Sequence, residues 1–516
     1  MERPWLKVWP EGVPTSLEYP EAPAYQPVLE QASQSPERCA VAQAETGTCL
    51  TYEKLATLAR GVAAWLQGRG VGPGSQVLYS AFNTVEAAAG LIGVWMSGGA
   101  AVLVDPLTTS EDLRFQLEGR NIRVAVASPE FYERERSVLA EAGVEDVLVL
   151  TGYYEGGSPR VSPLGEALTL SGSWREPSLK PREDVGVVMY YSGIAGRTMQ
   201  TLHTHFAVVS STMALTTMLQ LGRPPTSLVV APLTHILGLQ AGLLSSLYYG
   251  GTAVLMRRWN PTIALSSSAS WRVNYLSGAP MMHEALLAEA KSRGLPTGWS
   301  LELGVSGGAP LKPEVQEEYP RVLKAPLVQL YGMTETWVVT FQPKHLAHVK
   351  ATVGIPLPDV DAKIVDPERP TRELGIGEVG ELLIKAPWLM KGYEDEEETR
   401  KAFVGEWIRT GDLMVMDENG LLYFRGVRKR MIKYKAYPIF PRDLEIMLES
   451  HPAVEKAYVY GEPHPDYGHL PAAKVVLKPE YKGMVTPEEL MDYVNKRVAF
   501  YKKLRKLEIV DKLPNK

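Results

Sequence analysis

Short apolar segments alternate with helix-like segments between Leu50 and Gly308, and this alternation constrains the fold more than any other feature of the chain. The apolar segments read QVLYSAF, AAVLVDP, IRVAVAS, SLVVAPL, GTAVLMR and LELGVSGG. Strands that alternate with helices pair in parallel and are joined by crossover helices. The helix-like segment LTYEKLATLARGVAAWLQGRG is amphipathic, with apolar residues at Leu55, Leu58, Ala59, Val62 and Leu66. We therefore predict an α/β fold.

The pattern changes beyond about Gly377, where short strands and turns replace the alternation. From Met431 onward the sequence predicts a small α/β unit, with helices in PRDLEIMLESHP and TPEELMDYVNKRV and strands in VEKAYVYGEP and PAAKVVLK. Thr486 and Glu489 have the spacing of a helix-capping box.

A chain of 516 residues is too long for one ordinary hydrophobic core, so several domains or subdomains are expected. We predict a large N-terminal body of packed α/β subdomains over residues 1–428. A small, mobile α/β C-terminal domain follows over residues 429–516.

The net charge, the N-terminal sequence and the lengths of the apolar runs argue against several classes of protein. A net charge of -5 and a pI near 6.1 argue against a protein that binds nucleic acid by neutralising phosphates. The N-terminal stretch MERPWLKVWPEGVPTSLEYPEAP is charged and proline-rich, so we expect neither a signal peptide nor an anchor. No run of 18 uncharged apolar residues occurs, so we expect no transmembrane segment and a cytoplasmic protein.

Cys39 and Cys49 lie ten residues apart, without nearby residues at metal-ligand spacing. We expect two reduced thiols in a reducing compartment, with a disulfide between them as the alternative.

A glycine-spaced turn follows a strand-like segment in YYSGIAGRTMQTLHTH, and such turns often bind phosphate. It is not the nucleotide loop that ends in Lys-Ser/Thr, because Gly193 and Gly196 are too close together and no lysine follows. Taken alone, the segment is more often an ordinary turn. A second glycine pattern, GIGEVG, leads into a strand and not a helix, so we exclude it as a dinucleotide fingerprint.

Three further motifs follow the turn in order: SGGAPL, LYGMTET and RTGDL. With PLTHILGL, VGIPLPDVDAKIVD and YFRGVRKRMIKYKAYPIFPRDLE, they make the chain resemble the adenylate-forming enzymes over nearly its whole length. These enzymes include acyl- and aryl-CoA synthetases, luciferases and the adenylation domains of peptide synthetases. The co-occurrence of YGMTE and TGDL is highly specific, and WLKVWPEGVP and THILGL look most like medium- or long-chain fatty acyl-CoA ligases.

The resemblance implies an ATP-dependent ligase that converts a carboxylic acid to acyl-AMP and then transfers the acyl group to CoA. Phosphoryl chemistry of this kind uses backbone amides, a divalent metal and cations rather than a covalent nucleophile. The implied substrates and cofactor are the acid, ATP, CoA and Mg²⁺, and a homodimer is compatible with the sequence.

The same resemblance assigns residues to the phosphate end of the site. Thr334 would touch the α-phosphate, and Glu335 would hold Mg²⁺ because a hard ion prefers oxygen ligands. His235 would lie where the acyl pocket meets the phosphates. The loop expected to hold the β- and γ-phosphates contributes Ser192, Gly193, Gly196 and Arg197.

At the nucleoside end, Tyr331 would stack on adenine and Asp412 would accept hydrogen bonds from the ribose. Lys433 would face CoA, and Lys429 would be the hinge. The remaining residues expected around adenine are Gly307, Gly308 and Ala309. Taken singly, each residue has an ordinary structural reading, but their order and spacing together favour a nucleotide site.

Two lysines of the family pattern are not seen in this sequence, one in the phosphate loop and one near the C-terminus. The family loop reads S-G-T-T-G-x-P-K-G, whereas here Ile194 and Ala195 replace two hydroxyls and Met199 occupies the lysine position. Arg197 lies in the same loop, but its planar guanidinium does not replace the compact positive charge of a lysine ammonium. The chain ends KLPNK, so Lys516 comes too early for the family's terminal catalytic lysine. The sequence either stops short of that lysine or lacks it.

Two departures fall at the hinge. The family's G-R becomes Gly426–Val427, and the glycine of K-G-Y becomes Ala436. Three interpretations stay open: a working acyl-CoA ligase, which we prefer; a degenerate member that binds nucleotide or acyl group or performs only the thioester-forming half; and an adenylating enzyme with another acceptor. The lost cations predict that adenylation is the weaker half-reaction.

Overall fold

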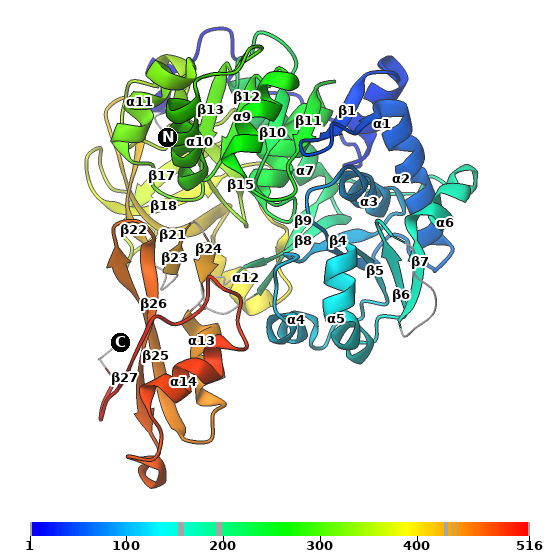
Figure 1. Cartoon of the computed structure of the whole chain (residues 1–516). Coiled ribbons are helices and arrows are strands. Elements are labelled where there is room, and N and C mark those ends of the chain that lie inside the picture. The colour runs from blue at the N-terminus through cyan, green and yellow to red at the C-terminus, as the bar shows by residue number, and fades with distance from the viewer. Residues whose placement is uncertain are drawn as a thin grey trace.

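The structure, a computed structural model, describes residues 3–152, 159–191, 199–427, 432–435, 437–439 and 441–513. It consists of a large N-terminal α/β body and a small C-terminal domain, which confirms the predicted fold class (Figure 1). The predicted phosphate-loop residues Ser192, Gly193, Gly196 and Arg197, and the predicted hinge Lys429, lie outside the described residues.

The first sheet of the body has nine strands within the described residues, and its centre is parallel. Every residue of the four strands that begin at Thr226, Thr252, Tyr275 and Leu303 is buried, which agrees with the largely apolar segments in which they lie. In spatial order the strands are β16 (Ile355–Pro356), β15 (Trp337–Phe341), β14 (Leu327–Met333), β13 (Leu303–Ser306), β12 (Tyr275–Gly278), β10 (Thr226–Val229), β11 (Thr252–Leu255), β1 (Cys39–Gln43) and β2 (Cys49–Thr51).

The second sheet has eight strands within the described part of the chain, and it contains the other predicted apolar segments. Its central strands are parallel, and two antiparallel strands close one edge. In spatial order the strands are β19 (Gly392–Tyr393), β9 (Met199–Thr204), β8 (Val185–Tyr191), β4 (Ala100–Leu103), β3 (Gln76–Ser80), β5 (Val124–Ala127), β6 (Asp146–Val149) and β7 (Arg160–Pro163).

The predicted amphipathic helix is α2 (Tyr52–Gln67), and all five of its predicted apolar positions are buried. It starts after Thr51 because the side chain of that residue accepts a hydrogen bond from the Lys54 N–H. Among the described residues, no helix is both long enough and apolar enough to cross a membrane. The other helices of the body are α1 (Gln26–Gln34), α3 (Val85–Met96), α4 (Ser110–Leu117), α5 (Pro129–Glu141), α6 (Leu164–Thr169), α7 (His205–Met218), α8 (Ser245–Leu247), α9 (Pro261–Ser270), α10 (Pro280–Arg293), α11 (Pro313–Leu323) and α12 (Glu396–Ala402).

A third, antiparallel sheet lies where the sequence pattern changes. The GIGEVG segment leads into its second strand and not into a helix, as expected. The strands are β17 (Asp361–Val365), β18 (Gly380–Lys385), β21 (Trp407–Met416), β20 (Phe403–Val404) and β22 (Leu422–Val427).

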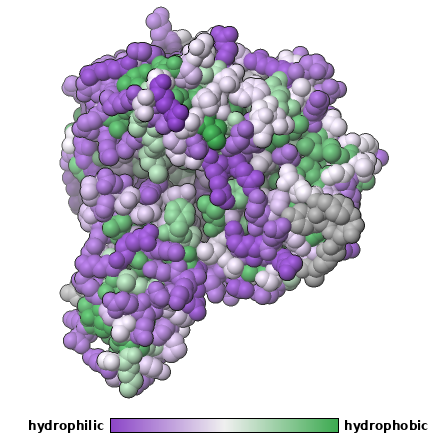
Figure 2. All heavy atoms as spheres, viewed as in Figure 1, coloured by the Kyte–Doolittle hydropathy of each residue, from purple (hydrophilic) through white to green (hydrophobic). Residues whose placement is uncertain are grey.

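The C-terminal domain has its own sheet and its own hydrophobic core, drawn from residues between Ile432 and Leu507. Thr486 and Glu489 form the predicted capping box. The space-filling view shows this domain as a separate lobe, with the surface hollowed where it meets the body (Figure 2). Its elements are β23 (Ile432–Tyr434), β24 (Tyr437–Ile439), α13 (Pro441–Glu449), β25 (Val454–His464), β26 (Gly468–Leu477), α14 (Pro487–Asn495) and β27 (Lys506–Ile509).

A buried ion cluster joins the two parts. Lys502 of the C-terminal domain lies 2.8 Å from a carboxylate oxygen of Asp112 on α4 and 3.7 Å from one of Asp443 on α13. Thr109 donates a hydrogen bond to the backbone oxygen of Arg497 at 3.0 Å. Because Lys502 is 7% exposed, the domains meet there through desolvated charges.

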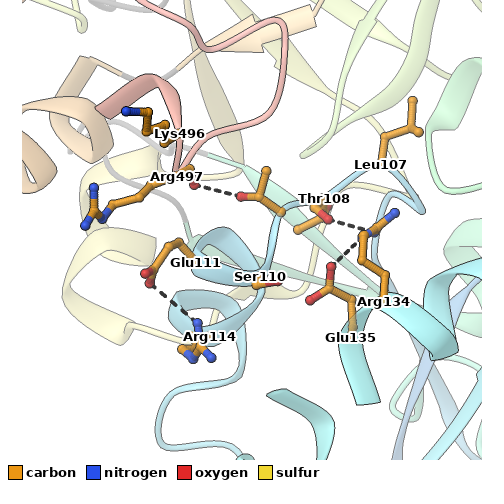
Figure 3. A pocket seen from close by; sticks show the side chains of 10 residues that line it. Leu107, Thr108, Ser110, Glu111, Arg114, Arg134, Glu135, Lys496 and Arg497 are labelled. Atoms are coloured by element: carbon orange, nitrogen blue, oxygen red, sulfur yellow. Dashed lines mark hydrogen bonds and ion pairs between the residues drawn. The ribbon is translucent and has the colours of Figure 1, made fainter. Parts of the chain in front are cut away.

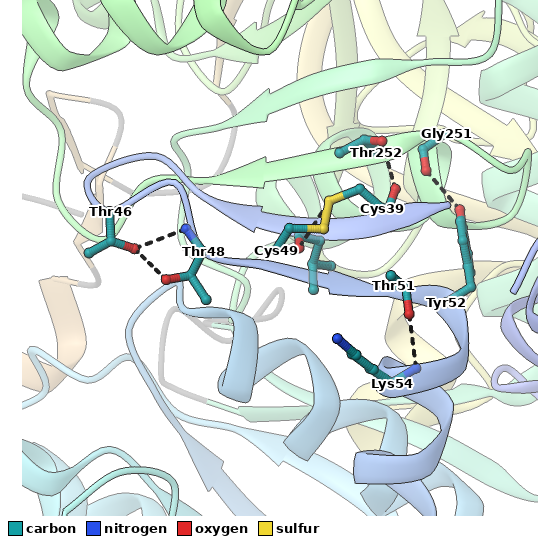
Figure 4. Close-up of a disulfide and its surroundings, with 10 residues drawn as sticks. Cys39, Thr46, Thr48, Cys49, Thr51, Tyr52, Lys54, Gly251 and Thr252 are labelled. Atoms are coloured by element: carbon teal, nitrogen blue, oxygen red, sulfur yellow. Dashed lines mark hydrogen bonds between the residues drawn. A yellow bond between two sulfur atoms is a disulfide. The ribbon is translucent and has the colours of Figure 1, made fainter. Parts of the chain in front are cut away.

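The expectation of two free thiols was wrong. Cys39 and Cys49 form a disulfide across the β1–β2 hairpin, with their Cα atoms 6.0 Å apart (Figure 4). The two cysteines belong to neighbouring antiparallel strands, and Cys39 pairs across the ladder with Thr51, two residues beyond Cys49. The hairpin therefore brings the two thiols together, which the spacing in sequence alone did not reveal.

Candidate functional site

Most of the described site residues lie at or just beyond the carboxyl ends of parallel strands of the nine-stranded sheet. His235 follows β10, the residues of the SGGAPL motif follow β13, and Tyr331 lies within β14. Open α/β sheets bind ligands at this edge. The fold therefore gathers motifs that are about a hundred residues apart in the sequence.

Glycine is favoured at two positions of the SGGAPL motif for different structural reasons. A Cβ atom on Gly307 would lie 2.4 Å from the Leu330 side chain, so a larger residue would require that side chain to move. Gly308 has a φ of +82°, a left-handed conformation that favours glycine, and it is exposed. Ala309 follows it and is half-buried. The exposed backbone here is available to a flat ligand.

Tyr331 and Asp412 are directly bonded, although 81 residues separate them in the sequence. The Tyr331 hydroxyl donates to Oδ2 of Asp412 at 2.6 Å, and the two residues are 9% and 7% exposed. This is a short, charge-assisted hydrogen bond. Tyr331 therefore fixes the carboxylate that was predicted to bind ribose.

The strand that carries Asp412 is held by a buried ion pair. The guanidinium of Arg409 lies 2.5 Å from Oε2 of Glu381, and the Gly411 N–H donates to the other carboxylate oxygen at 3.1 Å. Glu381 is 1% exposed. The RTGDL motif thus depends on a carboxylate from the neighbouring strand β18 for its position.

Thr334 and Glu335 occupy the tight turn between β14 and β15. The Thr336 N–H donates to the backbone oxygen of Met333 at 3.0 Å and closes the turn. Trp337, just after it, has a φ of +58° and is fully buried, so the surrounding packing holds a strained conformation next to the site.

Glu335 is fully buried, and Tyr393 of β19 donates to its Oε1 at 2.6 Å. The described residues contain no group of three or more His, Cys, Asp or Glu side chains that could hold a metal ion. Mg²⁺ normally takes one or two carboxylates and completes its shell with water and substrate phosphates. A single oriented carboxylate therefore fits Mg²⁺ delivered with a nucleotide.

His203 contacts Trp337, the residue that follows the turn. Trp337 donates its indole N–H to Nδ1 of His203 at 2.9 Å, and burial lowers the pKa of His203 to about 3. The ring is neutral at physiological pH, so it serves as a hydrogen-bond acceptor and not as a cation for phosphate.

His235 lies in the loop between β10 and the π-helix η3 (Leu237–Leu244). Its Nε2 is 3.2 Å from Oδ2 of Asp105, which follows β4 of the eight-stranded sheet. Asn83 holds the same loop: its side chain donates to the Ala231 oxygen at 2.9 Å and accepts from the Leu233 N–H at 3.0 Å. Two residues that follow strands of the eight-stranded sheet thus position His235, which follows a strand of the nine-stranded sheet.

The C-terminal domain faces this region. Burial, followed by the nearby Asp105 carboxylate, raises the pKa of Tyr437 to about 12. The Nζ of Lys433, the residue predicted to face CoA, lies 5.9 Å from the ring centroid of Phe424 on β22. A cavity of about 630 Å³ lies between α4, α5 and the C-terminal domain, and Lys496 and Arg497 line it (Figure 3).

Met199, at the family's lysine position, is the first residue of β9 and is 7% exposed within the hydrophobic core. The position therefore contributes packing and no positive charge.

Sequence reasoning missed the partners of the predicted residues: Tyr393, Asp105, Asn83 and Glu381. Asp105 had a usable signal, because it directly follows the apolar segment AAVLV, where ligand-binding residues of parallel sheets occur. The other three lie in segments without a motif, and only the tertiary structure reveals their contacts.

Comparisons with known proteins identify the family of the chain. Residues 28–394 match the family model described as "AMP-binding enzyme", and residues 443–516 match "AMP-binding enzyme C-terminal domain". A 4-coumarate–CoA ligase-like protein of Oryza sativa is 30% identical over 92% of this chain and 87% of its own length. A long-chain-fatty-acid–CoA ligase of Bacillus subtilis is 27% identical over 99% of this chain and 95% of its own length.

Among solved structures, the o-succinylbenzoate CoA synthetase of Bacillus subtilis, bound with a product analogue, superposes with a TM-score of 0.83. It is 27% identical, with 96% of each chain covered. A long-chain-fatty-acid–CoA ligase of Archaeoglobus fulgidus has a TM-score of 0.81 at 24% identity, over 97% of this chain and 99% of that chain, and shows the shared fold. The two family matches cover most of the chain, and the chain belongs to the AMP-binding, adenylate-forming enzyme family, whose relatives here are CoA ligases.

Proposed function

We propose that the protein is an ATP-dependent acyl-CoA ligase that activates a carboxylic acid, of the fatty-acid class, as acyl-AMP and transfers the acyl group to CoA. The hydrogen bond between Tyr331 and Asp412 carries the proposal, because it joins the two motifs assigned to the nucleoside at one buried point. The similarity to the long-chain-fatty-acid–CoA ligase, which covers nearly the full length of both chains, supports the choice of acid.

In the adenylation step, the carboxylate oxygen of the acid attacks the α-phosphorus of ATP and pyrophosphate leaves. Asp412 accepts hydrogen bonds from the ribose hydroxyls, and Tyr331 keeps the carboxylate in place while its ring lies against adenine. Thr334, in the turn after β14, donates to the α-phosphate. Glu335, oriented by Tyr393, would hold Mg²⁺, which neutralises charge on the phosphates.

In the second step, the sulfur of CoA attacks the acyl carbon, the bond from carbon to the phosphate oxygen breaks, and AMP leaves. His235 lies at the face that the C-terminal domain covers, so we assign it to the reacting acyl group. The contact between Lys502 and Asp112 supports a docked domain with strands β23 and β24 toward this face.

A second candidate is a family member in which only thioester formation, or only binding, persists. The burial of Met199 favours it, because adenylation builds negative charge between the α- and β-phosphates and this position supplies no cation.

Two assays on the same protein separate these candidates. The first measures acid-dependent exchange of pyrophosphate into ATP, and the second measures acyl-CoA formation from synthetic acyl-AMP, across fatty acids of increasing length. We expect both activities, with exchange the slower. Activity from acyl-AMP alone would favour the second candidate. Measurable ATP binding without either activity would refute the ligase.

A further inference from the structure

Asp105 has two carboxylate oxygens with different partners. Its Oδ1 accepts a hydrogen bond from the Leu107 N–H at 2.7 Å, which caps the turn after β4. Its Oδ2 lies 3.2 Å from Nε2 of His235. The side chain of Asp105 is 11% exposed, whereas that of His235 is 44% exposed. The carboxylate is thus fixed within the protein, and the imidazole projects from it toward solvent.

This geometry determines the tautomer of the imidazole. A carboxylate accepts hydrogen bonds, so the nitrogen that faces it carries the proton. In that tautomer, Nδ1 of His235 has a lone pair that can accept a hydrogen bond from a substrate. The Asn83 side chain fixes the backbone of the same loop. Gly238 packs directly against that loop, and a larger residue would not fit there because its Cβ atom would lie 2.2 Å from the Pro232 oxygen.

The segment that carries Asp105 also contacts the C-terminal domain. Thr109 donates to the Arg497 backbone oxygen, and Asp112 pairs with Lys502. Both contacts lie within seven residues of Asp105 along the chain. The segment 105–112 therefore contacts His235 at its first residue and the docked C-terminal domain near its last residue.

We infer that Asp105 is a positioning residue that fixes the orientation and tautomer of His235 for thioester formation, the step in which the C-terminal domain is docked. This inference rests on the proposed ligase function. Asp105 acts through His235 and does not touch the substrate. Loss of its carboxylate leaves the imidazole free to rotate and to exchange tautomers.

The test is a double-mutant cycle with Asp105→Ala, His235→Ala and the double variant, measured as acyl-CoA formation from synthetic acyl-AMP at saturating CoA. Asp105→Ala should slow thioester formation about tenfold or more, the effect of losing a hydrogen bond to a charged group. The same change in the His235→Ala background should alter the rate less than about twofold. Asp105→Asn keeps an acceptor oxygen and should retain more activity than Asp105→Ala.

Asp366→Asn is the matched control, since Asp366 also caps its turn, accepting from the Glu368 N–H at 3.0 Å, but lies in the third sheet's β17–β18 loop. It should leave both half-reactions within about twofold of wild type. Thermal midpoints and ATP affinity show whether each variant is folded. Equal losses from Asp105→Ala with and without His235 would overturn the inference. So would an unchanged rate in Asp105→Ala while the wild type forms thioester. If the wild type forms no thioester from any acyl-AMP, the proposed function fails as well.

Discussion

The hydrogen bond from Tyr331 to Asp412 provides the sharpest test of the nucleotide site. Asp412→Ala removes the carboxylate, and Tyr331→Phe removes only the hydroxyl that orients it. Because phenylalanine keeps the aromatic ring, Tyr331→Phe leaves any stacking on adenine intact. The two substitutions therefore separate hydrogen bonding to the ribose from stacking on the base.

The expected losses of ATP affinity follow from the hydrogen bonds that each substitution removes. A hydrogen bond to a charged group contributes about 1.5–3 kcal/mol, and about 1.4 kcal/mol corresponds to tenfold in affinity. Asp412→Ala should therefore raise the dissociation constant for ATP by about tenfold or more. Tyr331→Phe leaves the carboxylate present but less constrained, so we expect about three- to tenfold. In the Asp412→Ala background, Tyr331→Phe should have almost no further effect.

Isothermal titration calorimetry with ATP and Mg²⁺ measures these affinities. Tyr25→Phe is a suitable control, because Tyr25 is fully buried and its hydroxyl has no hydrogen-bond partner among the described residues. It should bind ATP like the wild type. Unchanged ATP affinity in Asp412→Ala would refute the assignment of the ribose site. A full additional loss from Tyr331→Phe in that background would show that Tyr331 acts independently of Asp412.

Three further predictions test other contacts. Tyr393→Phe removes the hydroxyl that donates to Oε1 of Glu335, so half-maximal pyrophosphate exchange should require several-fold more Mg²⁺, whereas an unchanged Mg²⁺ titration would exclude Glu335 as the metal ligand. Lys502→Met removes the ammonium that pairs with Asp112 across the domain contact, at a cost of about 3–5 kcal/mol, so limited proteolysis should release the C-terminal domain faster, and an unchanged cleavage rate would contradict a docking role. Reduction of the disulfide between Cys39 and Cys49, which are ten residues apart, should cost roughly 3 kcal/mol and lower the thermal midpoint, whereas Cys39→Ser should be insensitive to reductant.

The sequence predicted those parts of the structure in which local pattern and tertiary environment agree. The strand around Val126 is apolar throughout because it is buried on both faces, and α2 shows helical spacing because its predicted apolar positions pack on the core. The capping box at Thr486 is a purely local interaction, so its four-residue signature was sufficient.

The sequence was insufficient wherever a contact joins distant segments without a motif. Asp105 and His235 are 130 residues apart, and Glu335 and Tyr393 are 58 residues apart. The disulfide was missed for a related reason. Spacing alone allowed both redox states of the cysteines, and the pairing of β1 with β2 decided between them.

The charges around the proposed site also lead us to expect that adenylation is the more demanding half-reaction. Glu335 and Asp412 place two carboxylates where a polyanionic nucleotide is proposed to bind, while Met199 is buried as part of the core. Ionised carboxylates repel phosphates unless cations intervene, and a water-excluded site strengthens that repulsion. Each carboxylate has a hydrogen-bonding partner, Tyr331 for Asp412 and Tyr393 for Glu335. These hydroxyl groups orient the carboxylates but supply no positive charge. We therefore expect neutralisation of the phosphates to depend mainly on Mg²⁺. Thioester formation starts from acyl-AMP, which carries a single phosphate, so we expect it to depend less on cations than on the docked domain and His235.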